Sequence, residues 1–336
     1  MHPGLGVWGD ECYGLLQDPE LKELAAYLPS LLLDKWSTNT SRSYAYGFLK
    51  WKKWAAQYPE VTVLPAKPAY VCLYLMSLGQ EAISVSTLNN VLASLNWAHL
   101  LAGLQSPTLN GTVKCTAEGL RRRLARPRDC ASVITSQHIL QIIACSNVED
   151  LTDLRVLTLV LLSFSGFLRF SEVVAIRTEH LMFAEAHIEL TLPKAKNDQF
   201  RQGQVVYIAG LLSCACPIRM LKKYLAAAGI ELSTSQFIFR NLRFCSGHVV
   251  LVKENTHMSY TRVSEIVKSK YAQIGLDKKF YKLHSLRSGG ASAAANNQVS
   301  DRQLQRHGRW KTEAVKNRYI NESLSDLLSV SRNLGI

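Results

Sequence analysis

Apolar residues recur at helical spacing through most of this sequence, and this period limits the possible fold more than any other feature. In the stretch STNTSRSYAYGFLKWKKWAAQYP, aromatic and small apolar residues share one helical face. These residues are Tyr44, Phe48, Trp51, Ala55 and Tyr58. Residues 37–40 supply helix caps and Pro59 closes the pattern. Further helices are predicted near 67–79, 86–103 and 108–125.

The later part of the sequence stays mainly helical but changes period once. The stretch VEDLTDLRVLTLVLLSFSGFLRFSEVVAI predicts a buried helix, a turn at Gly166 and a short second helix. Ile188, Leu190 and Leu192 then alternate with polar residues, and apolar residues return at 205–208, which predicts a β-hairpin. Helical spacing resumes near 217–228 and 260–273, and again in the amphipathic tail ESLSDLLSVSRNLGI. We therefore predict a mainly α fold with a small antiparallel β-sheet in the later part.

An arginine-rich stretch marks the predicted boundary between two domains. A length of 336 residues favours two domains over one. The stretch EGLRRRLARPRD ends a helical pattern at a proline and carries Arg121, Arg122, Arg123, Arg126 and Arg128. We place an N-terminal helical domain at 1–128 and a second domain at 129–336. The arginines are either a connector that crosses a phosphate backbone or a flexible basic linker.

The net charge of +13 indicates a polyanionic partner. On the helix predicted after residue 37, Arg42, Lys50 and Lys53 lie opposite the apolar face, together with Lys52. This charged face is either a DNA-binding surface or an ordinary solvated surface.

Several other classes of protein are disfavoured by the sequence. No apolar run reaches the length of a membrane span, and the first residues lack the apolar core of a secretory signal. The eight cysteines show no disulfide-like spacing, which predicts reduced thiols inside a cell. One alternative remains: CAC at 214–216 and CSGH at 245–248 could together ligate zinc, although Cys-x-Cys is an unusual spacing for such a site.

Five short motifs follow one another along the second predicted domain. They are SGFLRFSEVV with Arg169 and Glu172, PKAKNDQ with Lys196, HSLR with His284 and Arg287, HGRW with Trp310, and NRYI with Tyr319. In this order and spacing they resemble the tyrosine recombinases, the phage-integrase superfamily that includes Cre-like and Xer-like proteins. The sequences KAKNDQF and HGRW are most similar to those of recombinases of eukaryotic DIRS-type and Crypton elements. The resemblance extends from about residue 135 to residue 336.

The resemblance implies a role for each matched cation. Arg169 and Arg287 take the places of the two family arginines, and their planar guanidinium groups suit the nonbridging oxygens of a phosphodiester. His284 belongs to the His-x-x-Arg pair and is the expected base for the nucleophile. Lys196 takes the place of the hairpin lysine, which protonates the leaving 5′ oxygen.

The remaining matched residues supply the nucleophile and its neighbours. Tyr319 takes the nucleophile position, and Trp310, nine residues earlier, takes the place that is His in many members and Trp in Cre. Its indole N–H is a hydrogen-bond donor. Glu172 and His307 are accessory candidates. For His307 two interpretations remain open: a phosphate donor, or a histidine at a helix end whose ring is bonded to backbone.

The resemblance further implies a two-domain, C-shaped clamp around double-stranded DNA. Cleavage would form a 3′-phosphotyrosine that a second DNA 5′-hydroxyl resolves, so no metal or other cofactor is expected. The C-terminal segment, with Leu324, Leu327, Leu328 and Leu334, would pack on a neighbouring copy in a DNA-bound tetramer. A role in integrating or excising a mobile element predicts location in the nucleus, and no membrane association is expected.

Two other functions share these residues. One is a topoisomerase that cuts and reseals a single strand by the same chemistry. The other is a domesticated DNA-binding protein that keeps the fold without recombination. The intact set of Arg169, Lys196, Arg287 and Tyr319 argues against the DNA-binding protein. Active-site residues alone do not distinguish the topoisomerase from a recombinase.

Overall fold

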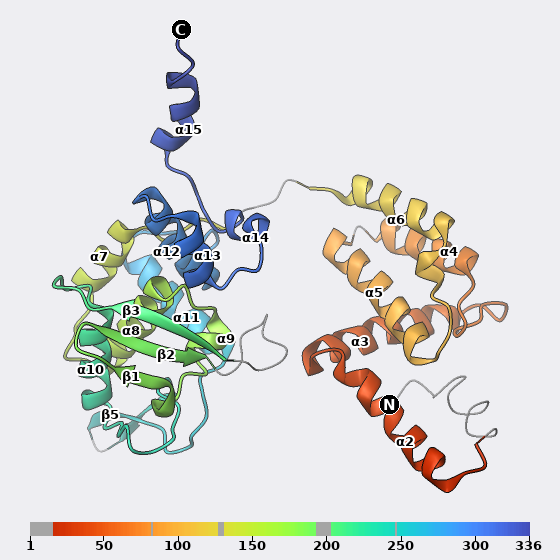
Figure 1. Ribbon diagram of the computed structural model, residues 1–336, viewed down its shortest axis with the longest axis horizontal. Helices are drawn as coiled ribbons and strands as arrows, with labels where there is room; N and C mark the ends of the chain where they lie inside the picture. Colours follow the sequence, from red (N-terminus) through yellow and green to blue (C-terminus); the bar gives the residue numbers. More distant parts are fainter. Residues whose placement is uncertain (1–15, 82, 127–130, 193–202, 246) are drawn as a thin grey trace. The chain divides into compact units, whose positions relative to one another are not determined.

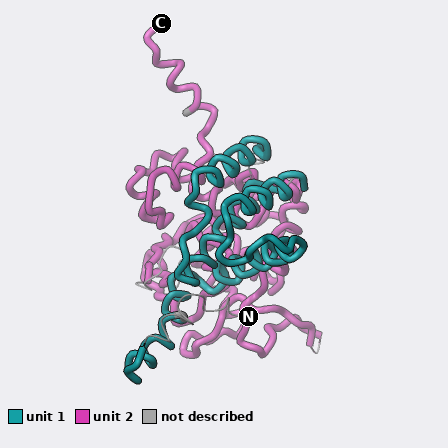
Figure 2. The backbone as a smooth tube through the Cα atoms, turned by 90° about the vertical axis from the view of Figure 1, so that its right-hand side faces the viewer, with its two compact units in different colours: residues 1–128 teal, residues 129–336 magenta. Residues whose placement is uncertain are grey.

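The computed structural model describes residues 16–81, 83–126, 131–192, 203–245 and 247–336. The chain divides into two compact units, residues 1–128 and 129–336, which Figure 2 shows in different colours. Both units are built mainly from helices, and a small antiparallel sheet lies in the second (Figure 1). The predicted fold class is therefore confirmed.

The first unit is helical in its described residues (Figure 1). Its elements are α2 (Pro19–Asp34), α3 (Thr38–Ala55), α4 (Pro68–Gln80), α5 (Val85–Leu101), the short 3-10 helix η1 (Pro107–Leu109) and α6 (Gly111–Leu124). The sequence pattern predicted α3, α4, α5 and α6, but neither α2 nor η1.

A single apolar core holds the first unit together. Trp51 of α3, Leu75 of α4 and Leu95 of α5 are fully buried in it. α3 begins after Ser37, whose hydroxyl accepts the backbone N–H of Thr40 at 3.3 Å. Tyr58, expected on the buried face, is 41% exposed because α3 ends at residue 55. The opposite face of α3 is left to solvent and carries the basic side chains.

The second unit holds the remaining elements, which Figure 1 labels. They are α7 (Ser136–Ala144), α8 (Leu151–Ser165), α9 (Phe170–Val173), η2 (Thr178–His180), β1 (Leu181–Phe183), β2 (His187–Leu192), β3 (Gln204–Ala209), α10 (Pro217–Ala227), β4 (Leu242–Cys245), β5 (His248–Leu251), α11 (Tyr260–Gln273), α12 (His284–Asn296), α13 (Asp301–Gly308), α14 (Glu313–Asn317) and α15 (Leu324–Arg332).

The predicted hairpin is formed by β2 and β3, which pair antiparallel with Ile188 opposite Ile208. The alternating residues Ile188, Leu190 and Leu192 point into the core and are buried. Two features go beyond the prediction: β1 adds a third strand beside β2, and β4 with β5 forms a separate two-stranded sheet.

Helix α8 is the centre of the second unit. Its side chains from Leu154 to Ser163 are all buried, as the continuous apolar run predicted. It packs against α10 and α12. The approach of α12 depends on glycine, because a Cβ at Gly289 would overlap the carbonyl of Ile134 and one at Gly290 would overlap the carbonyl of Phe164. This close packing brings α12 against the C-terminal end of α8.

Within the described ranges, no helix has the length and apolar character that crossing a membrane requires.

Candidate active site

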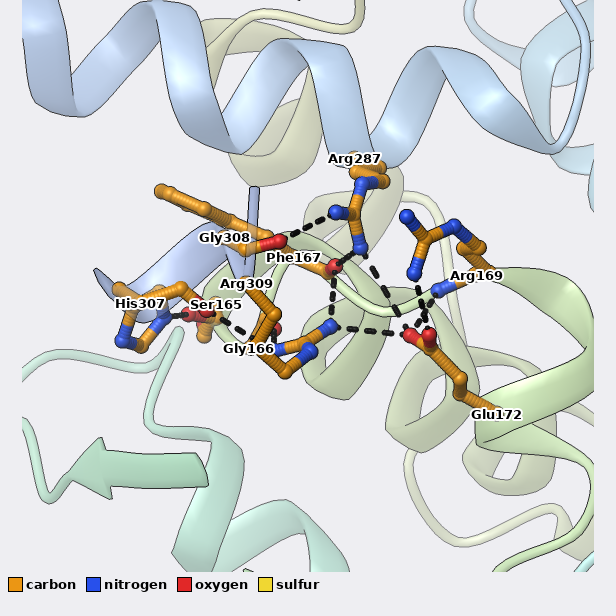
Figure 3. Close-up of polar contacts among 9 residues, drawn as sticks. All are labelled: Ser165, Gly166, Phe167, Arg169, Glu172, Arg287, His307, Gly308 and Arg309. Carbon is orange, nitrogen blue, oxygen red and sulfur yellow. Dashed lines mark hydrogen bonds and ion pairs between the residues drawn. The ribbon is translucent and has the colours of Figure 1, made fainter. Parts of the chain in front are cut away.

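The site begins at the turn that ends α8. Phe167 has a φ of 46°, in the left-handed region that is strained for a residue with a side chain. This conformation directs the Phe167 carbonyl at two guanidinium groups. Arg287 donates to it through Nη1, and Arg309 donates through Nη2 at 2.9 Å (Figure 3). Contacts from two other segments thus hold the strained turn in place.

Glu172 lies among three arginines next to this turn (Figure 3). Its Oε1 accepts from Arg169 Nη1 at 2.6 Å, and its Oε2 accepts from the Arg169 backbone N–H at 2.8 Å and from Arg309 Nη2 at 2.9 Å. Arg287 Nη1 is 3.6 Å from the same Oε2. The Glu172 side chain is 1% exposed, so one buried carboxylate balances part of the charge of three guanidinium groups.

Burial and charge act in opposite directions on Glu172. Burial raises the pKa of its carboxyl, but Arg309 and Arg169 outweigh this effect, and the pKa lies below its usual value. For Arg287, burial first and then the neighbouring charges of Arg169 and Arg309 lower the pKa. The carboxylate is therefore ionised at neutral pH, and the site around it carries an excess of positive charge that suits a phosphate.

Arg287 is fully buried and lies between the glutamate cluster and two aromatic rings. Its guanidinium carbon is 5.2 Å from the ring centroid of Trp310 and 5.2 Å from that of Tyr319. Its Nη2 donates to the carbonyl of Gly308, just before the Trp310 segment (Figure 3). Cation–π attraction and these hydrogen bonds fix the guanidinium beside the tyrosine.

The Tyr319 ring contacts three of the predicted site residues. Its centroid lies 5.1 Å from that of Trp310 and 5.0 Å from that of His284, in addition to the contact with Arg287. Trp310 is 4% exposed, and in the described part of the chain its Nε1–H has no hydrogen-bond acceptor. A buried donor without an acceptor is costly, and this N–H is available to an oxygen atom of a ligand.

Short polar contacts hold the segment that carries Tyr319. Lys316, buried on α14, forms an ion pair with Asp301 at the start of α13. Ser292 of α12 donates its hydroxyl to the Tyr319 carbonyl at 3.3 Å and accepts the backbone N–H of Asn321 at 2.7 Å. The backbone on both sides of Tyr319 is thereby tied to α12 and α13.

His307 is held by backbone. Its Nε2–H donates to the Ser165 carbonyl at 2.8 Å, and its ring lies edge-on to Phe167 with centroids 4.6 Å apart (Figure 3). Burial lowers the pKa of His307, so it is neutral at pH 7. Of the two interpretations left open by the sequence, this geometry is that of a histidine bonded to backbone.

The structure thus brings together Arg169, Glu172, Arg287, Trp310 and Tyr319. His284 lies beside the Tyr319 ring, and His307 is bonded to Ser165 at the end of α8. Lys196 and Arg128 lie outside the described residues.

The predicted DNA-binding residues of the first unit fall into two groups. Exposed side chains belong to Arg42, Lys50, Lys53, Arg122, Arg123 and Arg126. Arg121 is half-buried, where it donates to Asn89 at 3.0 Å and pairs with Glu118 at 3.3 Å. Arg122 is 3.7 Å from the same carboxylate, so part of the charge on α6 is balanced within the helix.

Sequence reasoning missed Arg309. It lies one residue before Trp310 inside the quoted motif HGRW, yet neither charge nor period gave it a role. It has a φ of 56°, and its side chain is 5% exposed. A buried arginine in the left-handed region has no periodic signature, so only the structure reveals its contacts.

Across the described ranges, no group of three or more His, Cys, Asp and Glu residues is arranged to hold a metal ion. Cys214 and Cys216 are among the free thiols.

Comparison with known proteins identifies the class. Residues 132–325 match the model of the phage integrase family. An integrase/recombinase xerD homolog from Selenomonas ruminantium is 30% identical over 288 residues, covering 84% of this chain and 82% of the homolog. The chain therefore belongs to the phage integrase family and is a tyrosine recombinase.

Solved structures share the fold at low sequence identity. The XerH site-specific recombinase bound to a palindromic difH substrate aligns with a TM-score of 0.62 and 13% identity, over 88% of this chain and 80% of that one. A lambda integrase dimer bound to a COC′ core site aligns with a TM-score of 0.56 and 14% identity, over 92% and 82%. The similarity to DIRS-type and Crypton recombinases stays a prediction from motif wording.

Proposed function

We propose that this protein is a site-specific DNA recombinase whose covalent nucleophile is Tyr319. The observation that carries the proposal is the position of the Arg287 guanidinium, 5.2 Å from the Tyr319 ring and 3.6 Å from the Glu172 carboxylate. A phosphate held by this arginine would lie beside the tyrosine hydroxyl. Proteins similar to this chain are recombinases and integrases by name, which supports the same activity here.

Positive charge and N–H donors would act on the phosphate itself. In the transition state the nonbridging oxygens gain negative charge, and fixed donors stabilise that charge. Arg169 and Arg287 can offer guanidinium N–H groups, because Glu172 holds Arg169 and the carbonyls of Phe167 and Gly308 hold Arg287. The Trp310 Nε1–H, without an acceptor in the described residues, would donate to a third position.

Proton transfer would accompany the exchange of bonds. The Tyr319 oxygen attacks phosphorus while His284, whose ring lies against it, assists removal of the hydroxyl proton. The bond to the 5′ oxygen breaks, and that oxygen takes a proton, which we assign to Lys196. A 5′-hydroxyl of another strand then attacks the 3′-phosphotyrosine and releases the tyrosine. One phosphoester is exchanged for another at each step, so no energy source is needed.

Double-stranded DNA would be bound by both units. In the first unit the exposed cations of α3 and the end of α6 are the proposed contacts with phosphate groups. Replacing Lys50 and Lys53 together by glutamine should weaken binding to unrelated duplexes equally and should reduce the slope of log K against log salt by about 2. An unchanged slope would remove α3 from the interface.

The test of function begins with covalent capture. Wild-type protein and Tyr319→Phe are incubated with a random-sequence duplex library that carries single-strand nicks, and DNA that stays attached in SDS is sequenced. Captured sequences are then placed in pairs on a supercoiled plasmid. A recombinase yields excised and inverted products that depend on two sites. A plasmid that is only relaxed, with a single site sufficient, would support the topoisomerase instead.

We further propose that copies of the protein assemble into a tetramer on DNA. Leu324, Leu327 and Val330 of α15 are 58% to 73% exposed in the single chain. A pocket of about 640 Å³ lies in the second unit between β3 and α13, lined in part by Val205 and Tyr207. We assign this pocket to α15 of a second copy, since an apolar helix face and an apolar pocket are complementary.

The energetics favour assembly only on DNA. Burying each leucine contributes about 1.5 to 3 kcal/mol. Association costs about 4 to 15 kcal/mol, so this contact alone does not hold free copies together. DNA that places two copies side by side lowers this cost.

Removing the tail tests the assembly directly. Deletion of residues 323–336 should keep single-site DNA binding and abolish synapsis, as measured by light scattering of complexes with two-site DNA. Leu212→Ser, which removes a fully exposed leucine outside the tail, is the matched control and should assemble normally. Normal synapsis by the truncated chain would refute the exchange of α15.

Nuclear location remains a prediction from the resemblance to eukaryotic elements, and the xerD homolog described above comes from a bacterium. Imaging of a fluorescent fusion in a eukaryotic cell tests it, and exclusion from the nucleus would contradict it.

A further inference from the structure

Arg309 occupies a backbone position where glycine would be more favourable. It follows the last residue of α13 with φ 56° and ψ 39°, the left-handed conformation that commonly ends a helix. A residue with a Cβ is strained there, and such strain persists only where surrounding contacts hold it. The contacts of the arginine side chain must therefore offset this strain.

The Arg309 guanidinium donates all four of its Nη hydrogens inward (Figure 3). Nη1 donates to the carbonyls of Gly166 at 3.1 Å and His307 at 2.9 Å. Nη2 donates to the Phe167 carbonyl at 2.9 Å and to Glu172 Oε2 at 2.9 Å. Because protein acceptors occupy all four Nη hydrogens, Arg309 is placed to orient other groups rather than to hold a phosphate.

Two of these acceptors also hold the arginines assigned to the phosphate. The Phe167 carbonyl accepts from Arg287 as well as from Arg309, and Glu172 accepts from Arg169 as well as from Arg309. Phe167 and Arg309, which both have left-handed backbones, are thus hydrogen-bonded to each other. Movement of either one would shift the groups that orient both remaining arginines.

Arg309 also competes with Arg287 for the single carboxylate. Glu172 Oε2 is 2.9 Å from Arg309 Nη2 but 3.6 Å from Arg287 Nη1. If Arg309 were absent, the carboxylate would be free to close the longer gap and pair fully with Arg287. A guanidinium neutralised in this way attracts a phosphate less strongly.

We infer that Arg309 is a positioning residue for strand cleavage. It holds the Glu172 carboxylate and the Phe167 carbonyl in place, and it keeps the charge of Arg287 available for the phosphate. This inference rests on the proposed recombinase function and adds to it a residue that never touches the DNA.

The variant Arg309→Gly removes the guanidinium and suits the left-handed backbone, so it should fold. We expect its single-turnover rate of covalent adduct formation, measured with saturating protein on nicked captured duplex, to fall about a hundredfold, the effect of misplacing groups at a reacting centre. The dissociation constant for the same duplex should stay close to the wild-type value. Added guanidinium chloride should restore part of the rate.

The pH profile provides a readout that loss of stability would not move. The charged groups facing Glu172 are Arg169 from the start of α9, Arg287 from α12 and Arg309 after α13. Arg309 lowers the pKa of Glu172, so its removal raises that pKa. The acid side of the rate profile should therefore move to higher pH in Arg309→Gly.

A matched control is Arg155→Met, which removes another buried arginine of the same unit. The Arg155 Nη1 donates to the Arg240 carbonyl at 2.7 Å, and the residue is 1% exposed. This variant should lose thermal stability but keep the wild-type rate per folded molecule and the wild-type pH profile. A slow rate and a shifted profile in Arg155→Met as well would reduce Arg309 to a structural role.

The outcomes separate the inference from the function on which it rests. If wild-type protein forms no adduct, the proposed function fails. If wild type reacts and Arg309→Gly reacts equally fast, only the inference fails. If Arg309→Gly does not fold, Arg309→Lys provides the test. A lysine keeps the charge but cannot hold four acceptors in one plane, so this variant should also cleave slowly. A wild-type cleavage rate in Arg309→Lys would overturn the inference.

Discussion

The buried carboxylate of Glu172 offers the sharpest test of the electrostatics of the site. Glu172→Gln keeps the shape of the side chain but removes its charge, leaving three guanidinium groups with no balancing anion. The glutamate accepts hydrogen bonds of 2.6, 2.8 and 2.9 Å in a position with 1% side-chain exposure. Breaking a buried ion pair of this kind costs about 3 to 5 kcal/mol. For a unit of this size, that loss lowers Tm by about 6 to 20 °C.

The effect should depend on pH in a defined direction. The pKa of Glu172 is lower in the folded protein than its usual value. Ionisation therefore stabilises the fold above about pH 4.3, and this contribution is lost as the pH falls through the lower, folded-state pKa. The difference in Tm between wild type and Glu172→Gln should be largest near neutral pH and should shrink in acid.

Calorimetry of the full chain across this pH range measures the difference. Glu185→Gln is the matched control, because it makes the same chemical change on an exposed side chain of the same unit, and its Tm should follow that of wild type. A Glu172→Gln variant as stable as wild type at pH 7, or a deficit that persists unchanged in acid, would refute the assignment of this carboxylate as the balancing charge.

Three further predictions concern the same site. Gly290→Ala should separate α12 from the end of α8, since its Cβ would overlap the Phe164 carbonyl. We expect a lower Tm and slower cleavage, and an unchanged Tm would contradict the close packing. Trp310→Phe keeps an aromatic ring but removes the N–H, so the cleavage rate should fall about a hundredfold while DNA affinity stays constant, and equal losses of both would point to packing alone. EDTA should leave adduct formation unchanged, because guanidinium and indole donors do what a metal would do at the phosphate; inhibition that zinc or magnesium reverses would contradict this.

The sequence predicted those elements in which the spacing of apolar residues matches the side chains that are buried in the fold. The alternation at 188–192 predicted a strand whose apolar residues are buried, and the motif order predicted Arg287, Trp310 and Tyr319, which the fold brings together. The short strands β4 and β5 were missed because all of their side chains are exposed or half-buried and carry no clear alternation. Arg309 was missed because its role depends on a left-handed backbone and on carbonyls more than a hundred residues earlier.

The central claim is that Tyr319 forms the covalent bond with DNA in a site built around Arg287 and Glu172. The most direct measurement is protease digestion of the SDS-stable adduct on nicked captured duplex, followed by mass spectrometry of the peptide that carries nucleotides. We predict a phosphoester on the peptide that contains Tyr319, attached to the 3′ end of the cleaved strand, and no adduct from Tyr319→Phe. A nucleotide on any other residue, attachment through a 5′ phosphate, or an adduct formed by Tyr319→Phe would contradict the claim.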